Sequence, residues 1–160
     1  MKIGADKVVI NSQAYKNPSL ITKAAEKFGA QCVVVSIDAK RGEDNHYYVC
    51  TENGTVVNSK TIKEWINEVE LLGAGEIFLN SIEYDGALTG YDLNLVKLAE
   101  ECSTIPLIVS GGAGTWKHFQ DAFSLGVSAV CTTNIFHFTE SSIRSAKQYL
   151  QKKNINIRGS

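Results

Sequence analysis

Residues 110–114, Ser-Gly-Gly-Ala-Gly, have the composition of a turn that binds an anion at the start of a helix. They follow an apolar run and precede residues 115–125, which we expect to be helical. Glycine lets backbone N–H groups approach an anion closely, and a helix N-terminus adds favourable partial charge. A second polar turn, Thr-Thr-Asn at residues 132–134, follows the next apolar run. Two such turns favour a shared phosphate site over a tight strand-to-helix turn without a ligand. The candidate phosphate-binding residues are Gly111, Gly112, Thr133 and Asn134.

Asp38 is the candidate for proton transfer. It directly follows the apolar residues 32–37, so we expect its carboxylate to be partly removed from water. Such a carboxylate suits general acid–base chemistry. An ion pair with Lys40 or Arg41 explains the same spacing equally well.

Other charged residues stand at both ends of the expected strands. The loop 81–92 holds three acidic residues and two glycines. An Asp-Gly pair is a common turn, but after a strand it makes Asp85 and Gly86 candidates for a substrate loop. Lys7 and Glu76 stand at the opposite, entry ends of their strands, where charge serves stability or a partner. An ion pair is the simplest interpretation of these two residues.

The spacing of the histidines and cysteines does not favour a metal site or a disulfide. His46, His118 and His137 lack the spacing of metal ligands, so we expect no bound metal ion. No Cys-x-x-Cys motif occurs. We expect the four thiols to be reduced and mostly buried, as in a cytoplasmic protein. They are Cys32, Cys50, Cys102 and Cys131.

Composition places the chain among compact single-domain proteins. It has 160 residues, 44% of them hydrophobic, and a net charge of −1. We therefore expect one domain over residues 1–160. The balanced charge gives no basic patch for nucleic acid, and no apolar run reaches the roughly 18–20 residues that span a membrane. The first residues resemble neither a signal peptide nor a transit peptide.

Apolar runs alternate with amphipathic stretches, which predicts strands followed by helices. Continuous apolar runs suggest strands covered on both faces, and strand–helix repetition predicts parallel pairing. The expected strands are residues 7–11, 32–37, 76–80, 107–110 and 129–132, with a hairpin over 47–58 that turns at Asn53-Gly54. The expected helices are residues 18–28, 61–72, 93–101, 115–125 and 141–152.

The class is therefore α/β, and the polar residues suggest a barrel. Each expected strand ends in a polar residue, which places the chemistry on one rim, as in a (β/α)₈ barrel. A complete barrel needs about 250 residues, so this chain fits a partial TIM barrel of five β/α units. Such a sheet leaves two unpaired edges and an exposed inner face. We expect it to self-associate or to be closed by a separate N-terminal half.

Six short motifs occur in order along the chain. They are Gly-Ala-Asp-Lys-Val at 4–8 with Ile10 and Asn11, Ile-Asp-Ala-Lys-Arg at 37–41, Gly-Ala-Gly-Glu-Ile at 73–77, Asp85-Gly86 with Gly-Tyr-Asp at 90–92, the glycine turn at 110–114, and Phe-His-Phe at 136–138. In this order they resemble a known family, the cyclase subunits of imidazole glycerol phosphate synthase in histidine biosynthesis. The resemblance covers nearly all residues and corresponds to the family's last five β/α units.

The resemblance implies a reaction without metal or organic cofactor. The family takes ammonia from a glutaminase partner through the barrel. It then cleaves and cyclises a bis-phosphorylated aminoimidazole carboxamide ribonucleotide. The products are imidazole glycerol phosphate and the aminoimidazole carboxamide ribonucleotide.

By resemblance, Asp38 is one of two catalytic aspartates, and Lys7 with Glu76 belongs to a charged ring that gates ammonia. Asn11 and Ser12 match one substrate phosphate pocket. The residues that match the pocket of the other phosphate are Asp85, Gly86, Gly111, Gly112, Thr133 and Asn134.

Departures from the family pattern leave alternatives open. The family's second catalytic aspartate belongs to a strand that this chain lacks, so we expect negligible turnover by the chain alone. Thr-Thr-Asn at 132–134 replaces the usual Ala-Ala-Ser, and residues 57–60 lack the usual Thr-Gly. A cyclase-like protein of sugar amidation in surface-polysaccharide synthesis is one alternative, and a non-catalytic phosphate-binding half-barrel is another.

Overall fold

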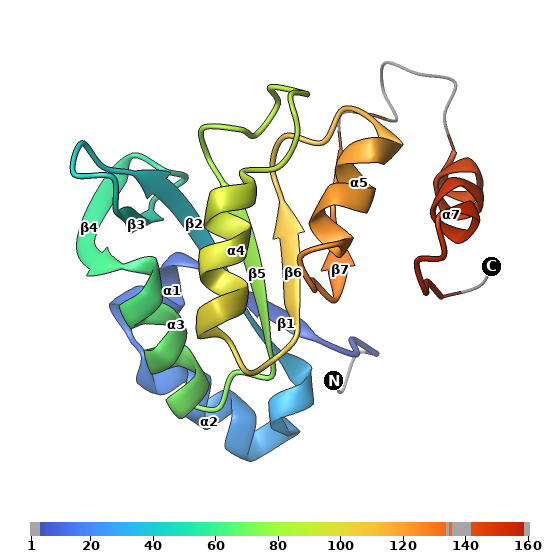
Figure 1. Cartoon of the computed structure of the whole chain (residues 1–160). Coiled ribbons are helices and arrows are strands. Elements are labelled where there is room, and N and C mark those ends of the chain that lie inside the picture. Colours follow the sequence, from blue (N-terminus) through green and yellow to red (C-terminus); the bar gives the residue numbers. More distant parts are fainter. Residues whose placement is uncertain (1–3, 134, 136–141, 159–160) are drawn as a thin grey trace.

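A seven-stranded, mostly parallel sheet forms the centre of the protein (Figure 1). The computed structural model describes residues 4–133, 135 and 142–158. Strand β2 pairs in parallel with β1 and β5, and the parallel ladder continues through β6 to β7. Strands β3 and β4 form the predicted antiparallel hairpin, and β3 pairs with the second half of β2 on the edge opposite β5. The strands are β1 (Val8–Ile10), β2 (Val33–Arg41), β3 (Tyr47–Thr51), β4 (Val56–Thr61), β5 (Glu76–Ser81), β6 (Leu107–Ser110) and β7 (Ala129–Val130).

Helices follow the parallel strands, and α3, α4 and α5 lie side by side on one face of the sheet (Figure 1). Local signals fix where some of them begin. Thr61 and Glu64 form a capping box at the start of α3, and the Asp92 side chain caps α4. The helices are α1 (Ser12–Lys16), α2 (Ser19–Phe28), the short 3₁₀ helix η1 (Ala30–Cys32), α3 (Ile62–Leu71), α4 (Leu93–Cys102), α5 (Trp116–Phe123) and α7 (Ile143–Lys152). This α/β arrangement is consistent with a TIM-barrel-like architecture.

The two faces of the sheet differ in burial. Ile77, Leu79 and Val109 face the helices and are at most 1% exposed, whereas Phe78 and Ile108 on the opposite face are only half-buried. In β2, by contrast, residues 33–35 are buried on both faces. The expectation of strands covered on both sides is therefore correct for β2 and wrong for β5 and β6.

Several elements differ from the sequence prediction. Strand β2 continues to Arg41 because its second half pairs with β3, so Asp38 lies within the strand and not after it. Helix α1 was not predicted, since five residues between two breaks give no periodic signal. Strand β7 ends at Val130, two residues earlier than expected, so the turn at 132–133 is longer.

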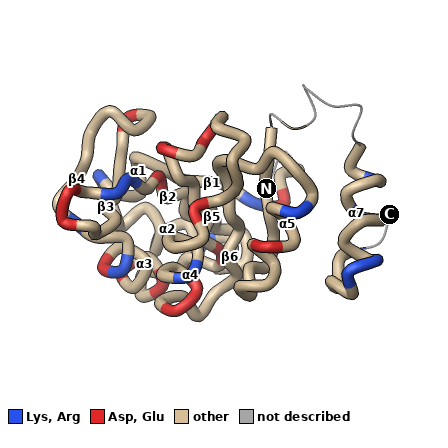
Figure 2. Tube along the Cα trace, turned by 45° about the horizontal axis from the view of Figure 1, so that its top comes forward, with Lys and Arg blue, Asp and Glu red and all other residues tan. Residues whose placement is uncertain are grey.

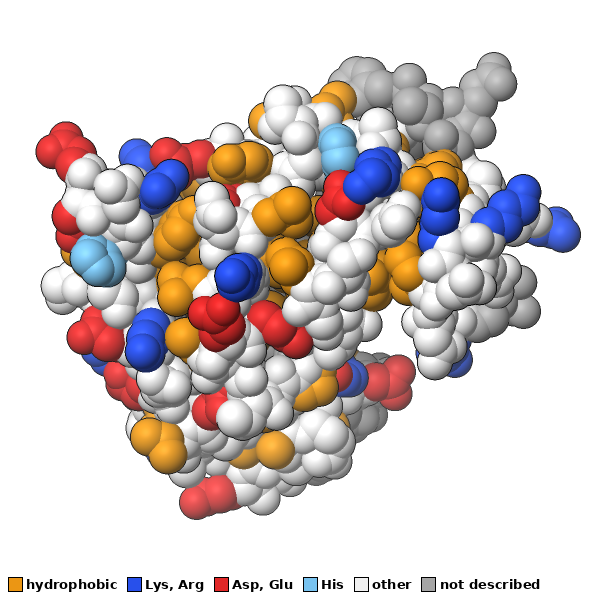
Figure 3. Space-filling model, in the orientation of Figure 1, with side chains coloured by type: hydrophobic (Ala, Val, Ile, Leu, Met, Phe, Trp, Pro, Cys, Tyr) orange, Lys and Arg blue, Asp and Glu red, His pale blue; other side chains and the backbone are white. Residues whose placement is uncertain are grey.

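An apolar groove lies beside the last strand. It has a volume of about 460 Å³ and separates β7 and α5 from the C-terminal helix α7. Figure 3 shows hydrophobic side chains gathered between α5 and α7. The apolar residues that line the groove include Phe119, Phe123, Val130, Ile143, Leu150 and Ile157. This part of the core is therefore incompletely filled by the described residues.

The cysteines follow the sequence expectation only in part. All four are free thiols, but only Cys50 is buried, whereas Cys32, Cys102 and Cys131 are partly exposed. The expectation that most of the thiols are buried is therefore wrong. Burial, together with the nearby Asp38 carboxylate, raises the pKa of the Cys50 thiol, which keeps it protonated. Figure 2 shows acidic and basic residues interspersed along the chain. Within the described ranges, none of the helices combines the length and the apolarity that crossing a membrane requires.

Candidate functional site

The carboxylate of Asp38 lies between amide side chains from two other segments of the chain. Asn11, directly after β1, donates from Nδ2 to Asp38 Oδ2 at 3.0 Å and to Ser36 Oγ at 3.2 Å. Asn80 on β5 donates from Nδ2 to Asp38 Oδ1 at 3.2 Å. The parallel register places Asp38 directly opposite Asn80. Both oxygens therefore have a donor, and their orientation is fixed.

The side-chain amides of Asn11 and Asn80 are the partners of Asp38, in place of the ion pair with Lys40 or Arg41 that the sequence also allowed. Among the described residues, neither Lys40 nor Arg41 forms an ion pair with Asp38. The backbone N–H of Arg41 donates instead to Glu83 at 3.0 Å. Asn80 Oδ1 is buried without a partner in the described part of the chain. A buried unpaired acceptor costs about 1–3 kcal/mol. We interpret this cost as the consequence of turning the amide donor of Asn80 toward the carboxylate.

The glycine turn at residues 110–114 packs tightly against the loop that follows β5. Gly112 has a φ of 106°, and a Cβ there would lie 2.1 Å from the carbonyl oxygen of Gly90. A Cβ on Gly114 would lie 2.3 Å from the carbonyl oxygen of Leu88. The Gly90 N–H donates to the Gly112 carbonyl at 2.8 Å. Glycine is thus required here by backbone packing, independently of any ligand.

The same turn leaves backbone donors unused. Gly111, Gly112 and Ala113 are buried, and in the described part of the chain their N–H groups have no acceptor. Buried backbone N–H groups are nearly always paired. They lie at a small pocket in front of α5. The pocket is lined by Asp85, Gly86, Leu88, Ser110, Gly111, Gly112, Ala113, Thr132 and Thr133. An anion at the start of a helix would satisfy these groups.

A second, larger cavity adjoins this pocket. It has a volume of about 270 Å³ and is lined by Asp38, Asn53, Asn80, Ile82 and Asp85. Asp85 lines both spaces, so they lie at the same end of the sheet. The structure therefore brings the predicted carboxylate and the predicted glycine turn to one rim.

Ser12 makes contacts that the sequence did not indicate. It is the first residue of α1, and its Oγ accepts the backbone N–H of Glu52 at 3.1 Å. Glu52 in turn forms an ion pair with Lys16. Ser12 thus ties the hairpin turn between β3 and β4 to the segment after β1, near Asn11.

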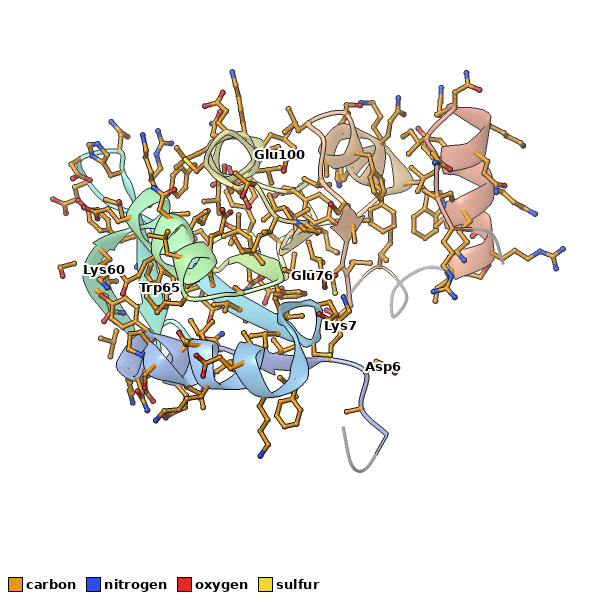
Figure 4. All side chains as sticks on the ribbon, turned by 90° about the horizontal axis from the view of Figure 1, so that it is seen from below. Asp6, Lys7, Lys60, Trp65, Glu76 and Glu100 are labelled. Atoms are coloured by element: carbon orange, nitrogen blue, oxygen red, sulfur yellow. The ribbon has the colours of Figure 1, made fainter. Side chains whose placement is uncertain are left out.

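Lys7 and Glu76 form an ion pair at the other end of the sheet (Figure 4). Glu76 begins β5, and Lys7 directly precedes β1. The side chains are 44% and 20% exposed. The ion pair that the sequence suggested is therefore present, opposite the rim that carries Asp38.

His118 supports the glycine turn. Its Nδ1 accepts the N–H of Gly114 at 3.1 Å, and its ring packs against Gly90. His118 therefore has a structural role, in agreement with the absence of ligand spacing. His137 and the predicted phosphate residue Asn134 lie outside the described residues.

Comparison with known proteins identifies the family. A family model described as "Histidine biosynthesis protein" matches residues 1–142. The chain belongs to this family.

Similar proteins of the histidine biosynthesis family carry a shared name. Proteins from Hydrogenobaculum sp. (strain Y04AAS1), Thermotoga sp. (strain RQ2) and Dictyoglomus turgidum are 47%, 46% and 47% identical over 97–99% of this chain. Each is named "Imidazole glycerol phosphate synthase subunit HisF". The chain spans only 61–63% of the length of these relatives.

Two polar residues at the rim were not among the candidates from the sequence. Asn80 ends a predicted strand, so the rule that polar groups at strand ends form the site could have selected it. Asn53 reaches the cavity from the hairpin turn. Its position depends on how the hairpin folds back onto the rim, and the sequence carries no local signal for that.

Proposed function

We propose that this chain carries the phosphate-binding turn and one catalytic carboxylate of an imidazole glycerol phosphate synthase cyclase. The reaction uses glutamine-derived ammonia to convert a bis-phosphorylated aminoimidazole carboxamide ribonucleotide. It yields imidazole glycerol phosphate and the aminoimidazole carboxamide ribonucleotide. The shared name of the relatives supports the histidine pathway over sugar amidation.

The observation that carries this proposal is the set of unused N–H groups at Gly111, Gly112 and Ala113, beside the cavity that Asp38 lines. A phosphate bound at the turn would be held by these donors and by the start of α5. The rest of a phosphate ester would then extend over the adjacent cavity toward Asp38. Holding the substrate in this way favours reaction by positioning, and the Asp38 carboxylate would transfer a proton there.

Two further sites complete the proposal. Asn11 and Ser12 would serve the second substrate phosphate, beyond Asp38 on the same rim. Ammonia from a glutaminase subunit would enter at the opposite end, past the Lys7–Glu76 ion pair. The proposed mechanism needs no metal or organic cofactor, and the proposed location is the cytoplasm.

The chain would form the last five β/α units of a barrel within one domain. Within the described residues, β1 and β7 each pair with a single strand, and the groove beside β7 is apolar. Val9 on β1 is 63% exposed. We propose that an N-terminal half or a second copy covers these edges. Light scattering on the chain alone should show a dimer or larger species, and a monodisperse monomer would contradict closure by self-association. Turnover by the chain alone should be negligible.

Calorimetry tests the phosphate site. Ribose 5-phosphate should bind the chain, and ribose without phosphate should not. Gly112→Ala should abolish binding, because the new Cβ must displace the backbone of Gly90. Gly126→Ala is the matched control: its φ is 104°, but its Cβ would meet only the end of the flexible Glu100 side chain. Equal binding of ribose and ribose 5-phosphate would refute the proposed site.

A further inference from the structure

The hairpin turn between β3 and β4 is fastened over the rim of the sheet. A Cβ on Gly54 would lie 2.8 Å from Ile82 Cδ1, so the turn packs directly on the loop after β5. Glu52 is held by Ser12 through its backbone and by Lys16 through its side chain. These contacts come from two separate segments, helix α1 and the loop after β5, so the turn has a defined position beside the cavity.

Asn53 stands at the end of this turn with its side chain unused. Glu52 and Asn53 both have left-handed backbones, with φ of 53° and 56°. Such conformations are unfavourable for residues other than glycine, although asparagine tolerates them best. The Asn53 residue is exposed, and within the described chain its carboxamide makes no hydrogen bond. It nevertheless lines the cavity that contains Asp38.

The larger cavity and the pocket of the glycine turn are suited to different chemical groups of a ligand. The described residues that line the larger cavity supply two carboxylates, two carboxamides and the apolar Ile82, and none of them is a lysine or an arginine. A phosphate there would face the charges of Asp38 and Asp85. An uncharged group with N–H or O–H donors would be accepted, and a carboxamide such as that of Asn53 can both donate to it and accept from it.

We propose that Asn53 is a specificity-determining residue, whose carboxamide hydrogen-bonds an uncharged amide or amine on the molecule whose phosphate binds at the glycine turn. This inference rests on the proposed function, because it assumes that the phosphate is bound in the adjacent pocket of the glycine turn. It assigns the larger cavity to the uncharged part of the substrate. The hairpin turn would thereby favour phosphate esters that also have an uncharged amide or amine group within reach of Asn53.

Calorimetry with two ligands tests the assignment. Ribose 5-phosphate carries only the phosphate and sugar, whereas aminoimidazole carboxamide ribonucleotide adds an amine and a carboxamide. Asn53→Gly removes the side chain and suits the left-handed backbone. It should weaken binding of the ribonucleotide by about 3- to 10-fold, the range for one net hydrogen bond, and leave ribose 5-phosphate unchanged. Asn45→Gly is the control, since Asn45 also has a positive φ of 65° but lines a different groove.

The outcomes separate this inference from the proposed function. If the ribonucleotide binds Asn53→Gly as tightly as the unaltered chain, or if both ligands weaken equally, the role of Asn53 is refuted while the phosphate site stands. If the unaltered chain binds neither ligand, the proposed function and this inference both fall. If Asn45→Gly reproduces the selective loss, the effect does not come from the cavity and the assignment is wrong.

Discussion

Replacing Tyr47 by phenylalanine should lower the free energy of unfolding by about 2–3 kcal/mol. The Tyr47 hydroxyl lies 3.0 and 2.9 Å from the two carboxylate oxygens of Asp92 and shares its single proton between them. The two residues are 7% and 5% exposed. Hydrogen bonds to a charged group contribute about 1.5–3 kcal/mol, and phenylalanine keeps the packing of the ring. Among the donors of the described residues, Asp92 would then retain the backbone N–H of Leu95, at 3.2 Å.

The neighbouring tyrosine supplies a matched control. The Tyr48 hydroxyl donates to Asp44 at 2.6 Å, but this pair is exposed to water. Water can replace the lost donor, so Tyr48→Phe should cost about 0.5 kcal/mol or less. Urea denaturation of both variants and of the unaltered chain measures the difference. Equal losses for the two variants, or a loss below about 0.5 kcal/mol for Tyr47→Phe, would refute the reasoning from burial.

Two further predictions use the same denaturation assay. Partial burial acts to raise the pKa of Glu70, but hydrogen bonds from Thr104 and Ser103 outweigh it and hold the pKa below its ordinary value of 4.5. A lowered folded-state pKa contributes stability above about pH 4.5 that is lost as the pH falls further. Glu70→Gln should therefore be less stable than the unaltered chain at neutral pH, with the difference shrinking below pH 4.5; a constant difference would contradict this. Lys7→Met should cost at most about 1 kcal/mol, because the ion pair with Glu76 is largely exposed on the lysine side; a loss of several kcal/mol would contradict it.

The order of strands and helices could be predicted because its signals are local. The capping residue Thr61 and the Asn53-Gly54 turn each stand within a few residues of the element they define. The end of β2 could not be predicted in this way. Its continuation past Asp38 depends on pairing with β3, about ten residues later in the chain.

The candidate site was only partly visible in the sequence. The glycine turn and Asp38 stand out because residue type and position after an apolar run suffice to mark them. The partners of Asp38 do not, because Asn11 and Asn80 reach it from other strands through the register of the sheet. The sequence favoured anion binding over a tight turn without a ligand as the reason for the glycines, whereas contact with the loop after β5 requires glycine whether or not a ligand binds.

Nuclear magnetic resonance of the backbone amides measures most directly whether the glycine turn binds phosphate. Inorganic phosphate would be titrated into the ¹⁵N-labelled chain at constant pH and ionic strength. The amide signals of Gly111, Gly112 and Ala113 should shift together and saturate, while those of Gly54 and Gly126 should stay in place. If the three turn amides move no more than these two reference glycines, the turn is a packing device and the proposed phosphate site is wrong.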